Sequence, residues 1–336
     1  MAVGVNEPGD HDDALDELIH RADLDGLVRL VDARCASADW AGVLRLRDRA
    51  RNAVQTGRQL WPVATLAEYR LALWAPAEWA ATVLDDESGR FTIGPLTEVA
   101  AQHHSFSELA GVVPSGPRLG FVAHERGLRG EAIDDDTTNP LEIPFARQHW
   151  EPEYLLATYS DDGVDAPSPE RPEHSLIERH TDDGKGVRAE DPSVELAVRQ
   201  LFDAWTAVSD GRVEVVCVEG TAAAAVRSLG VEHPGLAPIS SANALAWLAW
   251  AGASGGAHGR RRGGAIGRFG AWWLLAALGD VLDEWPVQPG ELGALAADLR
   301  WYWWAAGEPA LGWEVQLAVE DPSEGYAWAI SAHDAA

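Results

Sequence analysis

Cysteine and lysine are scarce in this sequence, and it has no long apolar run. Its two cysteines, Cys35 and Cys217, are too few and too far apart for a disulfide scaffold, and this usage is typical of the reducing cytoplasm. No uninterrupted apolar run reaches the roughly 18–20 residues that a membrane-spanning helix requires. The N-terminal residues have neither the basic nor the apolar region of a secretory signal peptide. We therefore expect a cytoplasmic protein without a membrane span.

Positive charge is also scarce. The chain has 26 basic residues, of which only Lys185 is a lysine, against 53 acidic ones, and its formal net charge is -27. A surface this negative repels nucleic acid and anionic lipid at long range. The composition therefore argues against a nucleic-acid partner, and any anion must bind at a local site.

Apolar residues, in contrast, are plentiful. Of the 336 residues, 46% are hydrophobic and 16 are tryptophan, which is enough for a sizeable core. The composition is that of a globular chain. Its length suits two domains, because domains commonly contain about 100–200 residues.

Residues 10–130 are predicted to form a helical domain. Apolar residues recur at helical spacing from Leu15 onward, and Asp39 stands where a helix N-cap is expected. Three prolines suit first helical turns: Pro62, Pro76 and Pro95. Short helices in series predict a solenoid-like scaffold, but no clean period of about 34 or 40 residues supports a named repeat family.

Residues 131–190 change in character, because they are rich in acidic residues, proline and glycine. Such composition is typical of a connection that is partly disordered. We therefore interpret this segment as an acidic linker between two domains.

Residues 191–334 are predicted to form an α+β domain. The β-branched run 212–220 reads as a strand, and residues 312–334 read as a hairpin that turns at Asp321-Pro322-Ser323-Glu324-Gly325. Helices are expected after Asp191, over 221–229, after Ser240, over 266–278 and over 291–306. The predicted fold class is mainly α: an N-terminal helical scaffold, then C-terminal helices with a roughly three-stranded sheet.

A cluster of arginines between glycines is the most unusual feature. Residues 233–279 contain no aspartate or glutamate, and their only basic residues are four arginines. Glycines permit close backbone approach, a helix start supplies free N–H groups, and guanidinium groups bind phosphate or carboxylate with two hydrogen bonds. One hypothesis is therefore an anion-binding loop, with these candidate residues: Ser254, Gly255, Gly256, His258, Arg260, Arg261, Arg262 and Arg268.

Other interpretations of this cluster stay open. The loop matches neither the P-loop pattern nor a dinucleotide-binding pattern, since a helix precedes it. The arginines also suit pairing with the chain's own carboxylates, or docking of a subunit. A third interpretation is a hairpin on a membrane surface, because Ala/Trp-rich helices flank the arginines.

Tryptophan is concentrated in the same half of the chain. The run RWYWWAAGE would place Trp301, Trp303 and Trp304 around a whole helix, so some of them would face more than the local core. Tryptophan and arginine are enriched at protein interfaces, and a stacking platform for sugars or bases is the alternative. Since no basic groove surrounds these residues, we interpret them as an interface.

No strong catalytic or metal-binding motif is present. His104 and Glu108 lie four residues apart, and His124 and Glu125 follow, but the pattern is not that of a zinc protease and falls on separate predicted elements. Cys217 lies among valines and is expected to be a buried apolar residue. No metal and no cofactor are predicted.

The C-terminal half of the sequence resembles a known protein family. The block WLAWAGASGGAHGRRRGGAIGRFGAWW, followed by RWYWWAAGEPALGWEVQLAVEDP, resembles an actinobacterial family of unknown function over about residues 191–334. Because that family has no assigned activity, the resemblance implies no catalytic residue.

Two hypotheses for function follow. The first is a non-catalytic interaction or regulatory protein with an Arg/Trp-rich binding surface for a protein partner or a second copy of the chain. The second is an enzyme or sensor that binds a small phosphate- or carboxylate-bearing ligand at the loop 254–268. The direction in which the arginines point distinguishes them.

Overall fold

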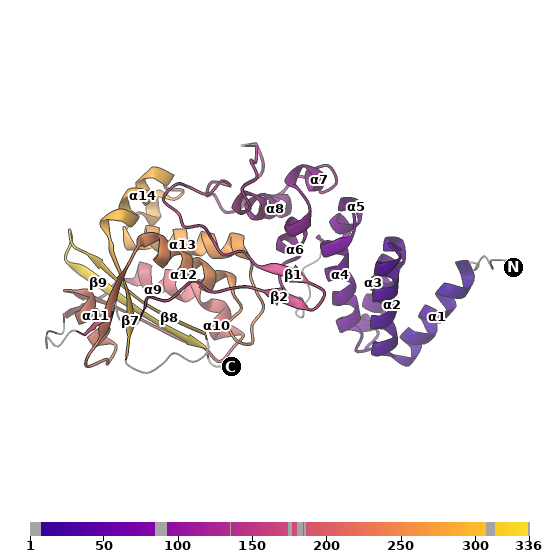
Figure 1. Ribbon diagram of the computed structural model, residues 1–336, viewed down its shortest axis with the longest axis horizontal. Coiled ribbons are helices and arrows are strands. Elements are labelled where there is room, and N and C mark those ends of the chain that lie inside the picture. The colour runs from indigo at the N-terminus through magenta and orange to yellow at the C-terminus, as the bar shows by residue number, and fades with distance from the viewer. Residues whose placement is uncertain are drawn as a thin grey trace. The chain divides into compact units, whose positions relative to one another are not determined.

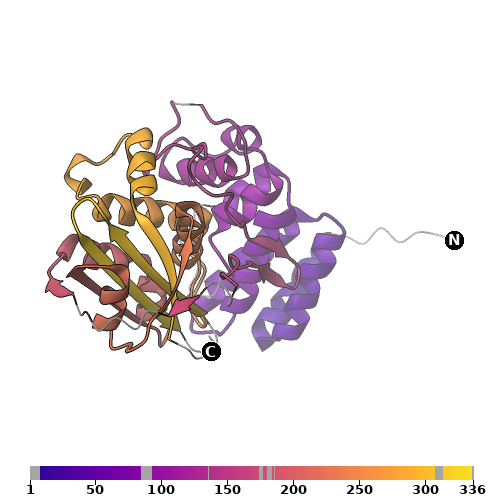
Figure 2. The same ribbon diagram turned by 60° about the vertical axis from the view of Figure 1, so that its left-hand side comes forward.

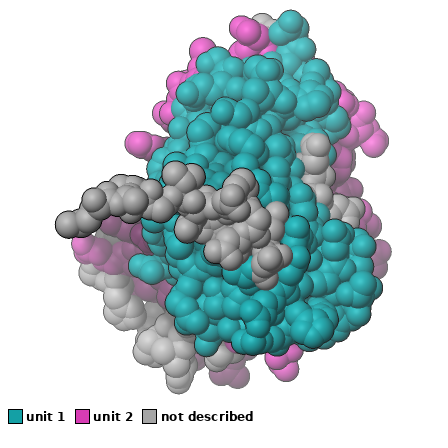
Figure 3. All heavy atoms as spheres, turned by 90° about the vertical axis from the view of Figure 1, so that its right-hand side faces the viewer, with its two compact units in different colours: residues 1–126, 135–138, 159–164 teal, residues 127–134, 139–158, 165–336 magenta. Residues whose placement is uncertain are grey.

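The computed structural model describes residues 8–84, 93–134, 136–173, 177–179, 184, 186–306 and 313–334; Lys185 lies outside them. The chain forms two compact units, coloured separately in Figure 3. Unit 1 comprises residues 1–126, 135–138 and 159–164, and unit 2 comprises residues 127–134, 139–158 and 165–336. No described helix has both the length and the apolar character needed to cross a bilayer.

Unit 1 is helical. Its helices are α1 (Pro8–Arg21), α2 (Leu24–Ala36), α3 (Trp40–Gln55), α4 (Trp61–Trp74), α5 (Ala77–Ala80), α6 (Leu96–His103), α7 (Phe106–Ala110) and all but the end of α8 (Pro117–Leu128), with a 3-10 turn at Ala81–Val83. Asp39 caps α3 as predicted, since its carboxylate accepts from the Gly42 N–H at 2.9 Å. Consecutive helices pack along the unit, and their shared core is made of leucine, valine and alanine.

A short hairpin completes unit 1. Its strands are β1 (Thr158–Ser160) and β2 (Gly163–Asp165). The Gln102 amide on α6 both donates to and accepts from the backbone of Tyr159, and the Tyr159 hydroxyl donates to the buried Glu98 carboxylate at 2.5 Å. Part of the predicted linker is thus ordered against the helices of unit 1.

Unit 2 is built on a sheet that is larger than the sequence predicts. Its strands are β3 (Glu178–Arg179), β4 (Val187–Ala189), β5 (Arg212–Glu219), β6 (Gly235–Ile239), β7 (Arg300–Ala305), β8 (Trp313–Asp321) and β9 (Tyr326–Asp334). They pair antiparallel in the order β3-β6-β7-β8-β9-β5-β4. The expectation of a roughly three-stranded sheet was wrong, because the described residues form a seven-stranded one.

Helices cover both faces of this sheet (Figures 1 and 2). The helices of unit 2 are α9 (Pro192–Leu201), α10 (Asp203–Ala207), α11 (Ala222–Ser228), α12 (Ser241–Ala253), α13 (Gly264–Leu278) and α14 (Pro289–Asp298), with a 3-10 turn at Leu282–Glu284. The alanines of α11 pack on one face, against Val216, Ala318 and Trp304. On the other face Trp247 of α12 packs against Trp303. Helix α13 lies against α12, where Gly267 is required because a Cβ would overlap the Ala249 carbonyl.

Strand β7 was predicted as the end of a helix over 291–306. The helix α14 ends at Asp298, and residues 300–305 are a strand between β6 and β8. Trp301 and Trp303 lie under one layer of helices and Trp304 under α11, so the strand is apolar on both faces. A strand buried on both faces loses the period of two, and its residues then resemble a buried helix in sequence.

Candidate functional site

The loop 254–263 connects α12 to α13 and is tightly packed in unit 2. Ser254 is buried, and its hydroxyl accepts from the Trp205 indole N–H at 2.9 Å and donates to the Ala251 carbonyl at 3.0 Å. Gly255 and Gly259 are in such close backbone contact that a Cβ on either would overlap the other. These glycines therefore serve the packing of the loop.

A carboxylate of the chain itself binds the backbone of this loop. Asp334, the last residue of β9, is fully buried; it accepts from the Ala257 N–H at 2.6 Å and from the Ser209 hydroxyl at 2.8 Å. Gly256 has φ +70, and a Cβ there would overlap the Asp334 carboxylate. The glycine-rich loop thus binds a carboxyl group of the chain itself.

Arg268 forms a buried ion pair with Glu151. The side chains are 1% and 0% exposed, and the guanidinium donates to the two carboxylate oxygens at 2.8 and 2.7 Å. Its other N–H groups donate to the carbonyl oxygens of Pro144, Phe145 and Ala146. All five donors of a guanidinium are therefore engaged. Arg268 ties the segment 144–151 to α13.

Glu151 is satisfied just as completely. Besides Arg268, it accepts from the Trp272 indole N–H at 2.7 Å, the Tyr154 hydroxyl at 2.8 Å and the Gln148 N–H at 2.6 Å. Burial alone would raise the pKa of this carboxyl, but the hydrogen bonds and charge of Arg268, with the two N–H donors, hold the pKa below its ordinary value of 4.5. Glu151 is therefore ionised in the folded protein at neutral pH.

The three consecutive arginines and His258 differ in their surroundings. The Arg262 guanidinium donates to the Gln200 carbonyl at 3.2 Å, and burial lowers its pKa although Asp203 acts against this. His258 is exposed and Arg260 is half-buried. Arg261 is 8% exposed and lies in the wall of a hollow.

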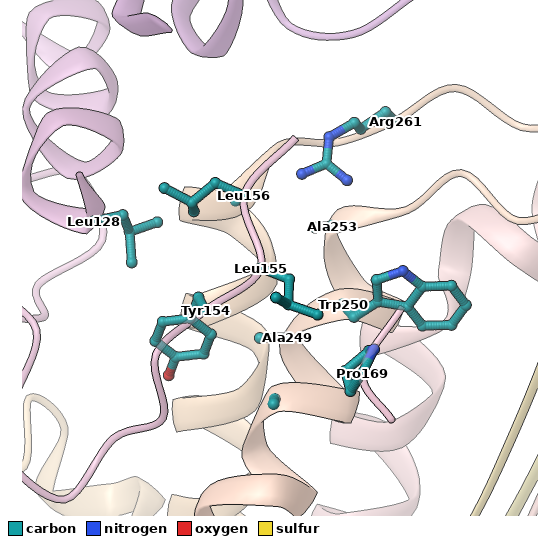
Figure 4. Close-up of a pocket in the computed structure, with 11 residues that line it drawn as sticks. Leu128, Tyr154, Leu155, Leu156, Pro169, Ala249, Trp250, Ala253 and Arg261 are labelled. Carbon is teal, nitrogen blue, oxygen red and sulfur yellow. The ribbon is translucent and has the colours of Figure 1, made fainter. Parts of the chain in front are cut away.

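The hollow beside Arg261 has mostly apolar walls (Figure 4). Its lining residues are Leu128, Tyr154, Leu155, Leu156, Pro169, Ala246, Ala249, Trp250, Ala253, Arg261 and Gly264. Figure 4 shows the guanidinium directed towards the interior, with Trp250 and Leu155 on the walls. Its volume of 20 Å³ is room for about one water molecule. We call it the Arg261 hollow.

A second, larger hollow adjoins the first one. It shares Leu128, Tyr154 and Leu156 with the Arg261 hollow and has a volume of 660 Å³. Its charged lining residues are Arg129, Glu131, Arg147 and Glu153. The volume falls in the range of about 300–1,000 Å³ that is usual for small-molecule sites.

The three tryptophans predicted as an interface are buried in unit 2. Trp301, Trp303 and Trp304 are 3–4% exposed. The indole N–H of Trp301 donates to the Ala296 carbonyl and that of Trp304 donates to the Ile330 carbonyl. Arg171 lies over the rings of Trp303 and Trp247, with its guanidinium carbon 5.5 and 5.9 Å from the ring centres. These residues therefore stabilise the sheet and the helix layer above it.

The other residues singled out in the sequence have local roles. Within the described part of the chain, no group of three or more His, Cys, Asp and Glu side chains could hold a metal ion. Glu108 forms a capping box with Ser105 at the start of α7, and His124 and Glu125 are buried on α8. Burial raises the pKa of both Cys35 and Cys217 to about 11.

Sequence reasoning missed the residues that define this region. Glu151 lies in the acidic segment 131–190, where nothing local distinguishes it from a surface carboxylate, and its partner Arg268 is 117 residues away. Asp334 is likewise the last residue of a strand and belongs to no motif. Each is recognisable only from the tertiary structure.

A comparison with known protein families shows the family to which the chain belongs. A model of a family of unknown function, DUF6183, matches residues 25–336, and the chain therefore belongs to that family. The match confirms the expected membership of a family of unknown function and extends it from the C-terminal half over most of unit 1. No curated protein and no solved structure matches the chain.

Proposed function

For this member of a family of unknown function, we propose a non-catalytic interaction or regulatory role in which the Arg261 hollow is the Arg/Trp-rich binding surface. One observation carries the proposal: Arg261 lies with a tryptophan, Trp250, in the wall of the hollow.

The chemistry of the walls favours recognition of one anionic group beside an apolar one. A guanidinium in low-dielectric surroundings forms strong hydrogen bonds with a carboxylate or phosphate. The leucines, alanines and Trp250 around it offer apolar contact. The net charge of -27 opposes polyanions, so the partner's anionic group is expected to be single.

A binding role, without catalysis, agrees with the polar side chains of this hollow. They are Arg261 and Tyr154. The guanidinium stays protonated at any physiological pH. Burial, followed by the nearby Glu151 charge, raises the pKa of Tyr154 well above its ordinary value of 10.0, so its hydroxyl is not a base.

Leu155 is the most exposed residue in the lining of the Arg261 hollow. It is 48% exposed although it lines the wall, and residues 152–157 have no regular secondary structure. We expect a partner's apolar group to displace Leu155, which is already half in contact with water. The larger adjoining hollow would receive the rest of the partner.

The adjoining hollow also favours the second candidate function, an enzyme or sensor for a small phosphate- or carboxylate-bearing ligand. Its 660 Å³ suits such a molecule, and Glu131 and Glu153 are carboxylates on its wall. Arg261 would bind the anionic group in both cases, so the two functions differ in the size of what binds.

Thermal unfolding in the presence of a probe panel tests both candidates. The probes are nucleotides, sugar phosphates, short-chain and aromatic carboxylates, and peptides with a free C-terminal carboxylate. Loss of one charge-assisted hydrogen bond of about 1.5–3 kcal/mol should weaken binding roughly 10- to 100-fold in Arg261→Met. Arg300→Met, which removes an exposed arginine on β7, is the matched control. If no probe shifts the melting temperature, or if both variants weaken binding equally, the hollow is not the binding surface.

A further inference from the structure

Strand β5 has an open edge in unit 2. The outermost strand, β4, contains three residues and pairs only with Cys217, Val218 and Glu219 of β5. Among the described residues, no strand lies beyond Arg212–Val216, whose inner side is paired with β9. The outward N–H and C=O groups of this stretch are therefore available to another strand.

Two adjoining grooves follow this edge. Their volumes are 330 and 230 Å³, and they share Arg188, Glu195, Val215 and Val216. Consecutive β5 residues from Val213 to Val216 line the first groove, although their side chains alternate between the two faces of the sheet. Because residues from both faces of the sheet line the same groove, the groove runs along the side of the strand.

Helices on opposite faces of the sheet supply the walls. Glu195 and Arg199 come from α9, and Ser228 and Leu229 come from the end of α11. An extended segment entering the groove would pair its backbone with β5 and point alternate side chains towards the two walls. At about 3.4 Å per residue, the open stretch of β5 accepts roughly five residues.

Apolar surface flanks the groove as well. Val187 on β4 is 68% exposed, and Leu196 on α9 is 57% exposed. Both are next in sequence to groove residues, Arg188 and Glu195. An added segment with apolar side chains would therefore cover surface that is now in contact with water.

The charge of the grooves specifies the partner further. Their lining has four acidic side chains and two arginines: Glu190, Asp191, Glu195, Glu214, Arg188 and Arg199. Arg199 is already paired with Glu195. The excess negative charge has the same sign as the whole chain, which disfavours a second copy and favours a positively charged partner.

We propose that the β5 edge binds an extended, basic segment of a partner polypeptide, in which lysine or arginine alternates with apolar residues. The segment adds an antiparallel or parallel strand beside Arg212–Val216. Backbone hydrogen bonds supply affinity, and the acidic walls supply specificity. This site is separate from the Arg261 hollow and goes beyond the function proposed above.

Fluorescence anisotropy with a labelled, end-capped heptapeptide of alternating lysine and valine tests the proposal on the full chain, at 150 mM salt. We expect saturable binding. Methylation of alternate backbone nitrogens on one edge of the peptide should weaken binding at least tenfold, because strand pairing needs those N–H groups. In the same complex, hydrogen exchange should slow at 212–216 and stay unchanged in β8, which is paired on both sides.

Reversal of the charges that line the groove provides a second test of the proposal. In the variant Glu195→Lys/Glu214→Lys, the affinity for the lysine–valine peptide should fall at least tenfold. This variant should instead bind a matched glutamate–valine peptide. Glu291→Lys/Asp298→Lys on α14 makes the same change in net charge away from the groove and should leave binding as in the parent. Should the double groove variant fold poorly, hydrogen exchange on the parent decides alone.

Several outcomes would overturn the proposal. They are the absence of saturable binding, equal binding of the N-methylated peptide, protection at residues other than 212–216, and equal effects of the two charge reversals. Dimerisation of the chain that is abolished by Glu195→Lys/Glu214→Lys would also overturn it, since the edge would then serve a second copy.

Discussion

Replacement of Arg268 by methionine should destabilise unit 2 strongly. Methionine keeps much of the apolar stem but leaves the Glu151 carboxylate, 0% exposed, without its counter-charge. Removal of one partner from a buried ion pair typically costs about 3–5 kcal/mol, because the other charge stays buried and uncompensated. Three carbonyl oxygens, of Pro144, Phe145 and Ala146, also lose their donor. We therefore expect the free energy of unfolding to fall by an amount near the upper end of that range.

Urea unfolding followed by tryptophan fluorescence measures this loss, because 12 of the 16 tryptophans belong to unit 2. With a slope of about 2–3 kcal/mol per M, the midpoint should fall by roughly 1–2 M. The control Arg300→Met breaks an exposed pair with Glu320, and such pairs contribute about 0–1 kcal/mol. The double variant Arg268→Met/Glu151→Gln should recover at least about 1 kcal/mol relative to the sum of the single changes.

The dependence on pH has a definite sign. In the parent, the pKa of Glu151 lies below its unfolded value, so its contribution is present above about pH 4.5 and is lost as the pH falls through the folded pKa. In Arg268→Met, only the N–H groups of Gln148 and Trp272 still oppose the effect of burial, so the pKa of Glu151 rises and acidification relieves the buried charge. The difference between parent and variant should therefore shrink from pH 7 to pH 4. A loss below about 1 kcal/mol, additive double-variant effects, or a difference constant with pH would refute this reasoning.

Three further changes have expected outcomes. Gly256→Ala should lower the free energy of unfolding by at least about 1–3 kcal/mol, because Gly256 has a positive φ and lies against the Asp334 carboxylate. Gly290→Ala in α14, with open space around it, should be neutral or should stabilise by about 0.4–1 kcal/mol. Equal effects of the two changes in thermal unfolding would contradict the packing described. Asp334→Ala should speed hydrogen exchange at 254–263, and exchange as slow as in the parent would show that Asp334 does not hold this loop. Because the pKa of Cys35 and Cys217 is raised to about 11 from 9.0, a disulfide reagent at pH 8 should label the folded chain about 100-fold more slowly than the unfolded one, and comparable rates would count against their burial.

Local features of the fold were predictable from the sequence. Asp39, Asp191 and Thr221 are N-caps, and each accepts a hydrogen bond from the N–H three residues later. The strand at 212–219 and the hairpin that turns at 321–325 also form as predicted. In each case the signal lies within a few neighbouring residues, where side-chain chemistry acts directly on the backbone.

The size of the sheet was not predictable in the same way. Strands β3 and β4 contain only two or three residues, and β6 contains a glycine and a proline, so none has the alternation of a strand. Their pairing depends on partners far along the chain. The same holds for Arg268, whose sequence context suggested an anion-binding loop while its partner, Glu151, stood in a segment with the composition of a linker.

The strand order has a consequence for the synthesis of the protein. Strand β5 pairs with β9, which leaves the ribosome after the other six strands of this sheet, and β8 and β9 separate β5 from β7. Until they emerge, β5 and β7 each have an unpaired inner edge, and contacts over such sequence separations form slowly. Unit 2 must therefore fold after its own translation is nearly complete, and nascent chains that stop before β8 would expose two aggregation-prone edges. The helices of unit 1 pack mainly on near neighbours in sequence, so they can assemble before the hairpin of β1 and β2 is added.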